Sequence, residues 1–223
     1  MPKPLLVIAV AAVLSSWLLS GCATSVNGKP VAGAAPAAAG PTCDYAVDTS
    51  PGAVTANGFP ATVSNQKKST VSFATPQGVL AVDLDPSLGP CSVEAIRFLV
   101  KKKFYDGSSC HRLTTNPSLQ VLQCGDPSGS GTGTPGFRYD DKLPVRGDYV
   151  RGVVAMANAG PGTNGSQFFI VYGAAQINPD YPVVGKVSSG MDLVDAVVAG
   201  GVVGGKQDGK PVKPMTFTSV TEG

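Results

Sequence analysis

The segment Val153–Tyr172 reads VVAMANAGPGTNGSQFFIVY. It holds two short apolar runs of strand composition, Val153–Ala157 and Phe168–Tyr172. Glycine, proline and asparagine punctuate the connection between them, which at about ten residues is longer than a plain hairpin turn needs. The extra length carries polar side chains, namely Asn158, Asn164, Ser166 and Gln167. A polar loop on a stiff pair of strands is suited to holding another peptide by its backbone.

Within this stretch, Met156–Ile170 (MANAGPGTNGSQFFI) resembles the central motif of the cyclophilin family of peptidyl-prolyl cis-trans isomerases. The resemblance extends from about Thr70 to Val220, and the flanking segments follow the family's order. It implies a mainly β fold, a closed eight-stranded antiparallel barrel capped by two α-helices. It also implies an enzyme that isomerises Xaa–Pro bonds without a cofactor or a metal.

Apolar patterning agrees with such a fold, although composition alone leaves other α+β folds open. The expected strands are 71–73, 80–84, Leu119–Gln123, Val150–Ala157, Phe168–Tyr172, Val183–Val187 and Met215–Val220. A helix is expected to begin near Pro90, with Ser92 as its possible cap. A second helix, Met191–Ala199, should end at Gly200-Gly201.

Prolyl isomerisation needs electrostatics rather than a covalent step. Amide resonance sets a barrier of roughly 18–20 kcal/mol. A donor aimed at the prolyl nitrogen lowers this barrier, because the nitrogen lone pair is freed only as the bond twists. Arginine suits this role, since it is permanently charged and its fork is rigid. Arg112, in Ser-Cys-His-Arg-Leu, resembles the family's arginine strand and is the candidate donor.

The resemblance also assigns the rest of the catalytic and substrate-binding set. Gln123, in Leu-Gln-Cys-Gly-Asp, matches a glutamine that binds the substrate backbone and steadies the arginine. Phe169 matches the aromatic floor of the proline pocket, with Met156 buried behind it, although an aromatic residue in a strand is usually only core. The main chain of Asn158 is expected to pair with the peptide in a strand-like mode. The other expected substrate-binding residues are Val121, Ala157, Ala159, Gln167, Ile177 and Tyr181.

The chain departs from the family pattern around this pocket. Gln120 and Val121 stand where the family commonly has Phe-Met, which predicts a smaller or more polar wall, and Thr114–Leu119 is longer than the usual hairpin loop. Gln176 occupies the common tryptophan position, so cyclosporin binding is expected to be weak at most. Tyr181 occupies a common histidine position and keeps a ring with a polar tip.

A glycine-rich loop and the single histidine lie near the expected site but are not assigned to the catalytic step. The loop Pro127–Phe137 resembles the family's small-residue gate to a secondary pocket that reads the residues before proline. A phosphate-binding function is not supported, because the loop lacks the lysine and the strand–loop–helix setting. His111 is interpreted as packed core and not as a general base, since this reaction moves no proton.

The N-terminus indicates export. A short basic start and the apolar run Leu5–Leu19 precede Leu-Ser-Gly-Cys, which describes a secretory signal and resembles a bacterial lipobox. Cys22 would then be lipidated, and several acyl chains would hold the protein at the membrane. The alternatives are ordinary secretion and an uncleaved anchor, although serines interrupt the run and a membrane span needs roughly 20 apolar residues.

The expected order of parts is a signal peptide (1–21), an Ala/Gly/Pro-rich tether (22–41), an N-terminal extension (42–69) and the catalytic domain (70–223). Whether the extension packs on the domain or trails from it is left open. A net charge of +2 with 14% charged residues indicates no nucleic-acid partner. Lys101–Lys103, the basic run, is interpreted as the solvated end of a helix.

The chain has five cysteines. Without Cys22, an even number remains in an exported chain, which favours two disulfides with three possible connectivities. Cys110 and Cys124 flank an expected hairpin, so a bridge between them is the first choice. Cys43 and Cys91 would then staple the extension to the domain. A zinc site is the rival, but the spacings match no common metal pattern.

Together these features predict a lipid-anchored isomerase, with monomer as the default, at the outer face of the bacterial membrane. Its partners would be proline-containing peptides and unfolded exported proteins. An alternative is a proline-peptide-binding or chaperone module with little turnover, which Gln120 and Gln176 favour. A structural envelope protein is a third possibility, supported only by the tether.

Overall fold

The computed structural model describes residues 25–26, 29–30, 42–60, 67–141 and 148–223. The predicted signal peptide and Cys22 lie outside these residues. The chain divides into two compact units, 1–39 and 40–223. In the first unit, the antiparallel pair β1 (Ser25–Val26) and β2 (Lys29–Pro30) is described.

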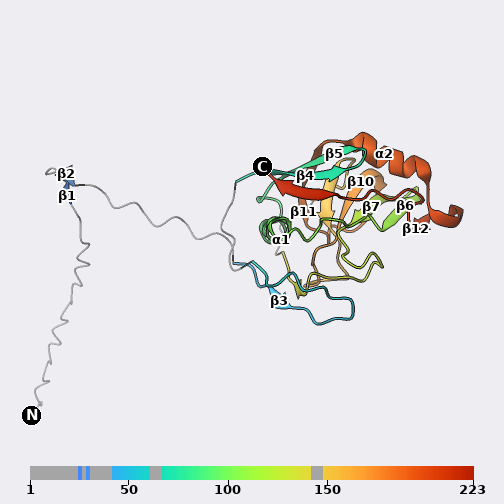
Figure 1. The fold of residues 1–223 in the computed structure, drawn as a ribbon. Helices are drawn as coiled ribbons and strands as arrows, with labels where there is room; N and C mark the ends of the chain where they lie inside the picture. The colour runs from blue at the N-terminus through green and yellow to red at the C-terminus, as the bar shows by residue number, and fades with distance from the viewer. Residues whose placement is uncertain (1–24, 27–28, 31–41, 61–66, 142–147) are drawn as a thin grey trace, which may run out of the picture. The chain divides into compact units, whose positions relative to one another are not determined.

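The second unit is built on a nine-stranded sheet with the order β12-β6-β7-β10-β9-β11-β5-β4-β13 (Figure 1). All its strand pairs are antiparallel. In chain order the strands are β4 (Ser69–Thr75), β5 (Gly78–Leu84), β6 (Arg112–Asn116), β7 (Leu119–Cys124), β9 (Val153–Met156), β10 (Phe168–Ala175), β11 (Val183–Ser189), β12 (Asp208–Gly209) and β13 (Ser219–Glu222). A separate pair joins β3 (Ala46–Val47) to β8 (Phe137–Arg138).

Two α-helices in the described residues pack on the sheet. The first, α1 (Pro90–Lys101), contacts β11 and β13, whereas α2 (Met191–Gly200) contacts β5 and β10. They lie on different sides of the sheet (Figure 1). A 3-10 turn, η1 (Val203–Gly205), follows α2. The mainly β fold with two helices is therefore confirmed.

The closed eight-stranded barrel stays a prediction. β12 and β13, at the two ends of the strand order, do not pair with each other in the described residues. The segments that lead into β6 and β13 do meet, because Ser109 forms an antiparallel bridge with Thr216. Backbone hydrogen bonds flank this bridge, from Cys110 to Met215 (2.9 Å) and from Phe217 to Ser108 (2.8 Å).

The start of α1 differs from the prediction that Ser92 caps it. The cap residue is Gly89, and Pro90 is the first helical residue. Ser92 is fully buried in the first turn, where its backbone N–H donates to the Asp141 carboxylate (2.7 Å). The N–H of Cys91 donates to the other Asp141 oxygen (3.2 Å). A carboxylate from a remote loop thus satisfies the free N–H groups that a local cap would serve.

Alternation along the strands divides the apolar residues into two clusters. One face of β10 contributes Phe168 and Ile170 to the main core, together with Leu122 of β7. The opposite face contributes Phe169 and Val171 to a second cluster with Val121, Tyr149, Val153, Ala155 and Val183. This second cluster forms the floor on which the candidate site is built.

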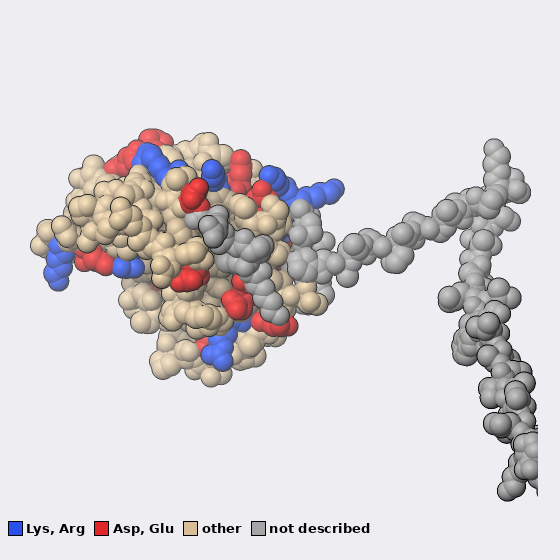
Figure 2. Space-filling view, turned by 180° about the vertical axis from the view of Figure 1, so that it is seen from behind, with Lys and Arg blue, Asp and Glu red and all other residues tan. Residues whose placement is uncertain are grey.

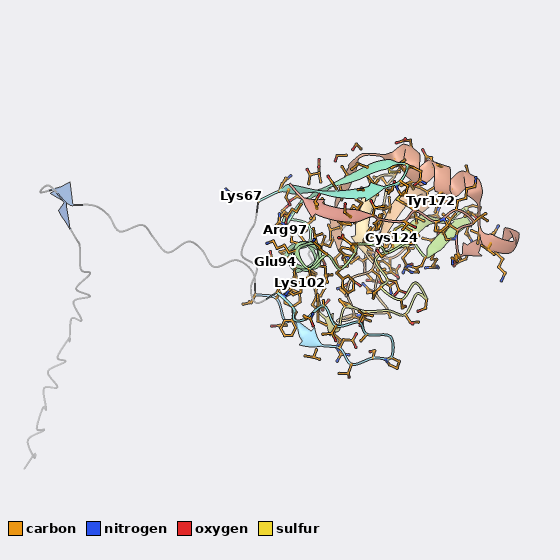
Figure 3. All side chains as sticks on the ribbon, viewed as in Figure 1. Lys67, Glu94, Arg97, Lys102, Cys124 and Tyr172 are labelled. Carbon is orange, nitrogen blue, oxygen red and sulfur yellow. A yellow bond between two sulfur atoms is a disulfide. The ribbon has the colours of Figure 1, made fainter. Side chains whose placement is uncertain are left out.

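A buried ion pair fastens α1 to the sheet. Arg97, labelled in Figure 3, is 2% exposed, and its Nε lies 2.8 Å from the Glu222 carboxylate on β13. Its Nη2 donates to Ser69 Oγ (2.8 Å). Breaking such a pair would leave an uncompensated buried charge, so the contact fixes α1 against the strands it covers.

Residues 42–60, the first described part of the extension, pack on the domain. The Tyr45 hydroxyl donates to the Cys91 carbonyl (2.7 Å), and the Tyr45 ring packs on Tyr139 (5.2 Å between centroids). Backbone N–H groups of Val54 and Ala56 donate to the carbonyls of Thr134 and Pro135. These residues therefore belong to the same compact unit as the predicted catalytic domain.

Both predicted disulfides are present. Cys43 is bonded to Cys91, and Cys110 is bonded to Cys124. The first joins the extension to α1, and the second connects the strand segments that carry Arg112 and Gln123 (Cys124 is labelled in Figure 3). No group of three or more metal-ligating side chains comes together among the residues described.

Replacing the Cys43–Cys91 pair with alanines is expected to lower the free energy of unfolding by about 4 kcal/mol, because the bridge closes a loop of 48 residues. The Cys110–Cys124 bridge closes only 14 residues and should contribute about 3 kcal/mol. Urea unfolding of the two double-alanine variants checks the ranking. If the first variant unfolds at the parent's urea concentration, the bridge does not fasten the extension.

Basic and acidic residues are interspersed on the face shown in Figure 2. Lys101 ends α1, and the run that follows it is exposed, as predicted. None of the helices described is long and apolar enough to cross a bilayer.

Candidate active site

Three neighbouring strands place the predicted catalytic residues in one row. Arg112 on β6 is the cross-strand partner of Gln123 on β7, which is in turn the partner of Phe169 on β10. Cross-strand partners project to the same face of a sheet, so the three side chains lie side by side. Residues far apart in the chain are brought together here by strand register.

A pocket of about 130 Å³ opens above this row, and we call it the small pocket. Its lining residues are Arg112, Leu119, Val121, Gln123, Ala157, Asn158, Phe169, Ile177 and Tyr181. All of them except Leu119 were predicted as catalytic or substrate-binding. The pocket combines an aromatic and aliphatic floor with charged and amide groups at its edge.

Packed aromatic rings support the floor of the small pocket. The rings of Phe169 and Tyr181 pack edge to face with centroids 5.6 Å apart. Tyr149 packs against both rings, and its hydroxyl donates to the Tyr181 carbonyl (2.9 Å) and accepts from the Tyr181 N–H (3.0 Å). Burial raises the pKa of Tyr149, so its hydroxyl keeps the proton that it donates. Tyr149 therefore fixes the segment that carries Tyr181.

The guanidinium of Arg112 is held by a carboxylate. Its Nε and Nη2 donate to the two oxygens of Asp208 on β12 (2.8 and 2.6 Å). Hydrogen bonds and the charge of Arg112 lower the pKa of Asp208, and the same contact raises the pKa of Arg112. Such a bidentate pair fixes the plane of the fork. N–H groups on the other edge remain available to the pocket.

An amide chain continues from Arg112 to the glycine-rich loop. Nη1 of Arg112 donates to the Gln123 side-chain oxygen (3.0 Å), so the Gln123 NH₂ group faces Gln167 and donates to it (2.8 Å). The Gln167 NH₂ group then donates to the carbonyls of Gly131 (3.1 Å) and Gly133 (2.9 Å). Each bond fixes the orientation of the next amide, which preorganises the site from Asp208 to the loop.

A larger pocket of about 390 Å³ adjoins the first, and we call it the large pocket. It is lined by Asp48, Ser50, Gln123, Gly131, Thr132, Gly133, Thr134, Arg138, Ala157, Asn158, Ala159, Thr163, Gly165, Ser166 and Gln167. The predicted residues Ala159 and Gln167 lie here. Gly131–Thr134 belong to the loop that resembles the family's gate, so the structure places that loop at a second pocket.

The Asn158 side chain is engaged within its own loop. Its Nδ2 donates to the Asn164 side chain and to the Asp180 carbonyl (both 3.0 Å), and its Oδ1 accepts from the Gly160 N–H (3.2 Å). In the described part of the chain, the main-chain N–H and C=O of Asn158 make no hydrogen bond. The main chain therefore has a free donor and acceptor for the expected pairing with a peptide.

Met156 is buried, as predicted, but it does not lie behind Phe169 and does not line either pocket. It is fully buried in the main core, where it is the cross-strand partner of Phe168. Successive strand residues face opposite sides, so Met156 and Phe169 point away from each other.

Two other expectations about the pocket wall are also corrected. Thr114–Asn116 belong to β6, and Pro117-Ser118 form the turn, so the segment is a tight hairpin rather than a long loop. The Gln120 side chain accepts from the Ala174 N–H (2.8 Å) and does not line the pocket. Leu119 fills this part of the wall.

His111 lies outside both pocket linings and is 9% exposed. Burial lowers the pKa of His111, which favours the neutral ring. Gln176, at the expected tryptophan position, is also absent from the lining of the small pocket, where its neighbour Ile177 contributes instead.

Three contributors to the small pocket and its support were missed by sequence reasoning, namely Leu119, Tyr149 and Asp208. Period-two alternation with Val121 and Gln123 would have placed Leu119 on the pocket face. Tyr149 and Asp208 carried no such signal, since both lie in short or irregular segments.

Comparison with known proteins adds independent evidence. The sequence model of the family described as cyclophilin type peptidyl-prolyl cis-trans isomerase/CLD matches residues 70–222. A probable peptidyl-prolyl cis-trans isomerase B of Mycobacterium tuberculosis is 44% identical over 164 residues, which cover 68% of this chain and 53% of the relative. Its Mycobacterium leprae counterpart is 41% identical over 174 residues, covering 72% of this chain and 57% of the relative. The chain thus spans about half the length of these relatives.

Solved structures of the same family also match the fold of this chain. A crystal structure of a Cryptosporidium parvum cyclophilin type peptidyl-prolyl cis-trans isomerase matches with a TM-score of 0.61 at 27% identity, covering 70% of this chain and 98% of that one. A second crystal structure, obtained in the presence of the dipeptide Ala-Pro, matches with a TM-score of 0.59 at 28% identity and covers 68% and 97% of the two chains.

Proposed function

Because the chain belongs to the cyclophilin-type peptidyl-prolyl cis-trans isomerases, we propose that it accelerates the isomerisation of Xaa–Pro bonds in peptides that bind across its two pockets. The observation that carries this proposal is the row of Arg112, Gln123 and Phe169. Phe169 gives an apolar floor for a proline ring, and Arg112 is a cationic donor whose orientation is fixed.

The expected mechanism follows from this row. The proline ring enters the small pocket on Phe169, and the peptide main chain pairs with Asn158 and the Gln123 amide. Arg112 donates to the prolyl nitrogen as the C–N bond twists and the nitrogen lone pair becomes available. Because this bond forms only as resonance is lost, it stabilises the transition state more than the planar ground states.

The direct test is exchange spectroscopy by NMR on a short Ala-Pro peptide with and without the full chain. We expect line broadening and cross-peaks between the cis and trans forms at catalytic protein concentrations. Uncatalysed exchange takes tens to hundreds of seconds. Binding of the peptide without faster exchange would reject the isomerase and leave a binding module.

The structure gives little support to the alternative of a binding or chaperone module with little turnover. It rested on Gln120 and Gln176, and neither side chain lines the small pocket. No other contact in the described residues favours it. Cyclosporin binding is still expected to be weak, since no tryptophan lines this pocket.

We further propose that the enzyme acts on exported proteins at the outer face of the membrane, anchored through a lipid on Cys22. The lipobox-like sequence and the two disulfides, which persist in oxidising compartments, support this location. We also propose that the bridge between Ser109 and Thr216 closes an eight-stranded barrel, with β12 as an addition at its edge.

Changing Cys22 to Ser is expected to move the protein from the membrane fraction to the soluble fraction or to block its maturation, because the acyl chains would be lost. Cell fractionation and the mass of the N-terminal peptide measure this. Ser25→Ala, at a nearby residue of the tether, is the control and should stay in the membrane fraction. A parent N-terminal peptide whose mass carries no acyl chains would contradict the lipid anchor and point to ordinary secretion or to an uncleaved anchor.

A further inference from the structure

We propose that the extension, residues 42–60, is part of the substrate site and makes the large pocket a subsite for an acidic side chain of the substrate. The proposal rests on the proposed isomerase function and adds a preference for a substrate class. Two observations carry it, the wall that the extension contributes and the charged groups that this wall brings together.

The extension forms one wall of the large pocket through Asp48 and Ser50. Backbone bonds fasten it to the gate loop, from Val54 N–H to the Thr134 carbonyl (2.8 Å) and from Asp48 N–H to the Gly136 carbonyl (3.0 Å). The Cys43–Cys91 disulfide anchors its start. Backbone hydrogen bonds and a disulfide therefore fix the wall to the gate loop and to α1.

The large pocket lies where it can receive a side chain near the proline. It shares Gln123, Ala157 and Asn158 with the small pocket. A peptide whose proline fills the small pocket, and whose chain runs toward the large pocket, passes these three residues. A side chain one or a few residues away in the peptide then reaches the large pocket.

Two charged residues line the large pocket, and they differ in what they can still bind. Asp48 is 9% exposed, and its Oδ1 accepts from the Ser50 N–H (2.9 Å) and hydroxyl (2.5 Å). Arg138 is exposed, and its backbone is fixed by pairing with Ala46 of the extension. Its guanidinium makes no hydrogen bond or ion pair with the part of the chain that the structure describes.

Arg138 is thus the charged group with free donors at this pocket. A planar guanidinium binds a carboxylate with two parallel bonds, which favours Asp or Glu in the substrate over a neutral residue of the same shape. The remaining lining side chains are short or uncharged. Hydrogen bonds from Ser50 and the charge of Arg138 lower the pKa of Asp48, so Asp48 is negatively charged. It offsets part of the charge of Arg138 and repels an acidic ligand, which keeps the preference modest.

The test compares peptides that carry Glu, Gln or Lys at each of the three positions before proline and are otherwise identical. For the full chain, we expect kcat/KM for the best-placed Glu peptide to exceed that for the Gln peptide by about threefold, in line with an exposed ion pair. Arg138→Gln should reduce this ratio to about one. Arg151→Gln, at a surface arginine that lines neither pocket, should retain it.

A second variant tests the wall itself. Replacing Cys43 and Cys91 with alanines releases the start of the extension and should lower the Glu/Gln ratio, with urea unfolding used to confirm that the variant is folded. Equal rates for Glu and Gln peptides, a preference for Lys, or a ratio that survives Arg138→Gln would each overturn the inference. If no peptide is accelerated, the proposed isomerase function itself fails.

Discussion

Replacing Arg112 with alanine is expected to lower kcat/KM for an Ala-Pro peptide by about 100- to 1000-fold, the usual cost of removing one preorganised donor from a transition state. Peptide affinity should change much less, because the prolyl nitrogen accepts a hydrogen bond only when its resonance is lost. Arg112→Lys should recover little of the activity. A lysine cannot reproduce the bidentate pair with Asp208 together with a bond to Gln123.

The chain offers a matched control for this experiment. Arg151 forms a similar bidentate pair with Asp195 (2.9 and 2.7 Å) but lies outside both pocket linings. Arg151→Ala should therefore retain the parent's kcat/KM in the same NMR exchange measurement. If Arg112→Ala retains most of the activity, the donor role is wrong and the pocket acts by confinement alone.

The row of catalytic residues could be predicted because each residue lies in a segment with its own signal. Arg112 and Gln123 belong to strands with recognisable motifs, and antiparallel register makes them partners. The disulfide between Cys110 and Cys124 could be proposed for the same reason, since both cysteines flank one hairpin. Local sequence is informative where the contact is between neighbouring strands.

Other parts of the site depend on contacts that no local pattern encodes. Asp208 lies in a two-residue strand and meets Arg112 across 96 residues of chain. The cap of α1 comes from Asp141, 49 residues beyond the N–H it serves. The motif resemblance does not tell which face of a strand a residue occupies. Successive strand residues face opposite sides, and Met156 therefore lies in the main core while Phe169 lines the pocket. The extension had too few apolar residues to predict its docking.

The contact of Asp208 with Arg112 suggests a positioning role for Asp208. It holds one edge of the guanidinium through Nε and Nη2 and leaves donors on the other edge available to the pocket. Its negative charge reduces the net charge of the donor, which by itself would slow the reaction. We expect fixed geometry to outweigh this effect, since a misplacement of about 1 Å can cost on the order of 100-fold in rate.

Asp208→Asn is accordingly expected to lower kcat by about tenfold with little change in KM, because the fork loses one charged, bidentate partner. Asp208→Glu should restore part of the rate, whereas Asp195→Asn, at the matched pair, should leave it unchanged. A merely structural role would instead lower the urea midpoint without this split between kcat and KM. A higher kcat in Asp208→Asn would show that charge reduction and not geometry dominates.

The pH dependence gives a second readout of the same pair. Hydrogen bonding to Arg112 lowers the pKa of Asp208 in the folded protein, so the pair is intact above the ordinary aspartate pKa of about 3.9. It is lost only as the pH falls through the lowered value. The parent's kcat should therefore stay level from neutral pH down to about pH 4, whereas Asp208→Asn should show a lower rate that is equally level. A parent rate that already falls between pH 7 and 5 would mean that another group controls Arg112.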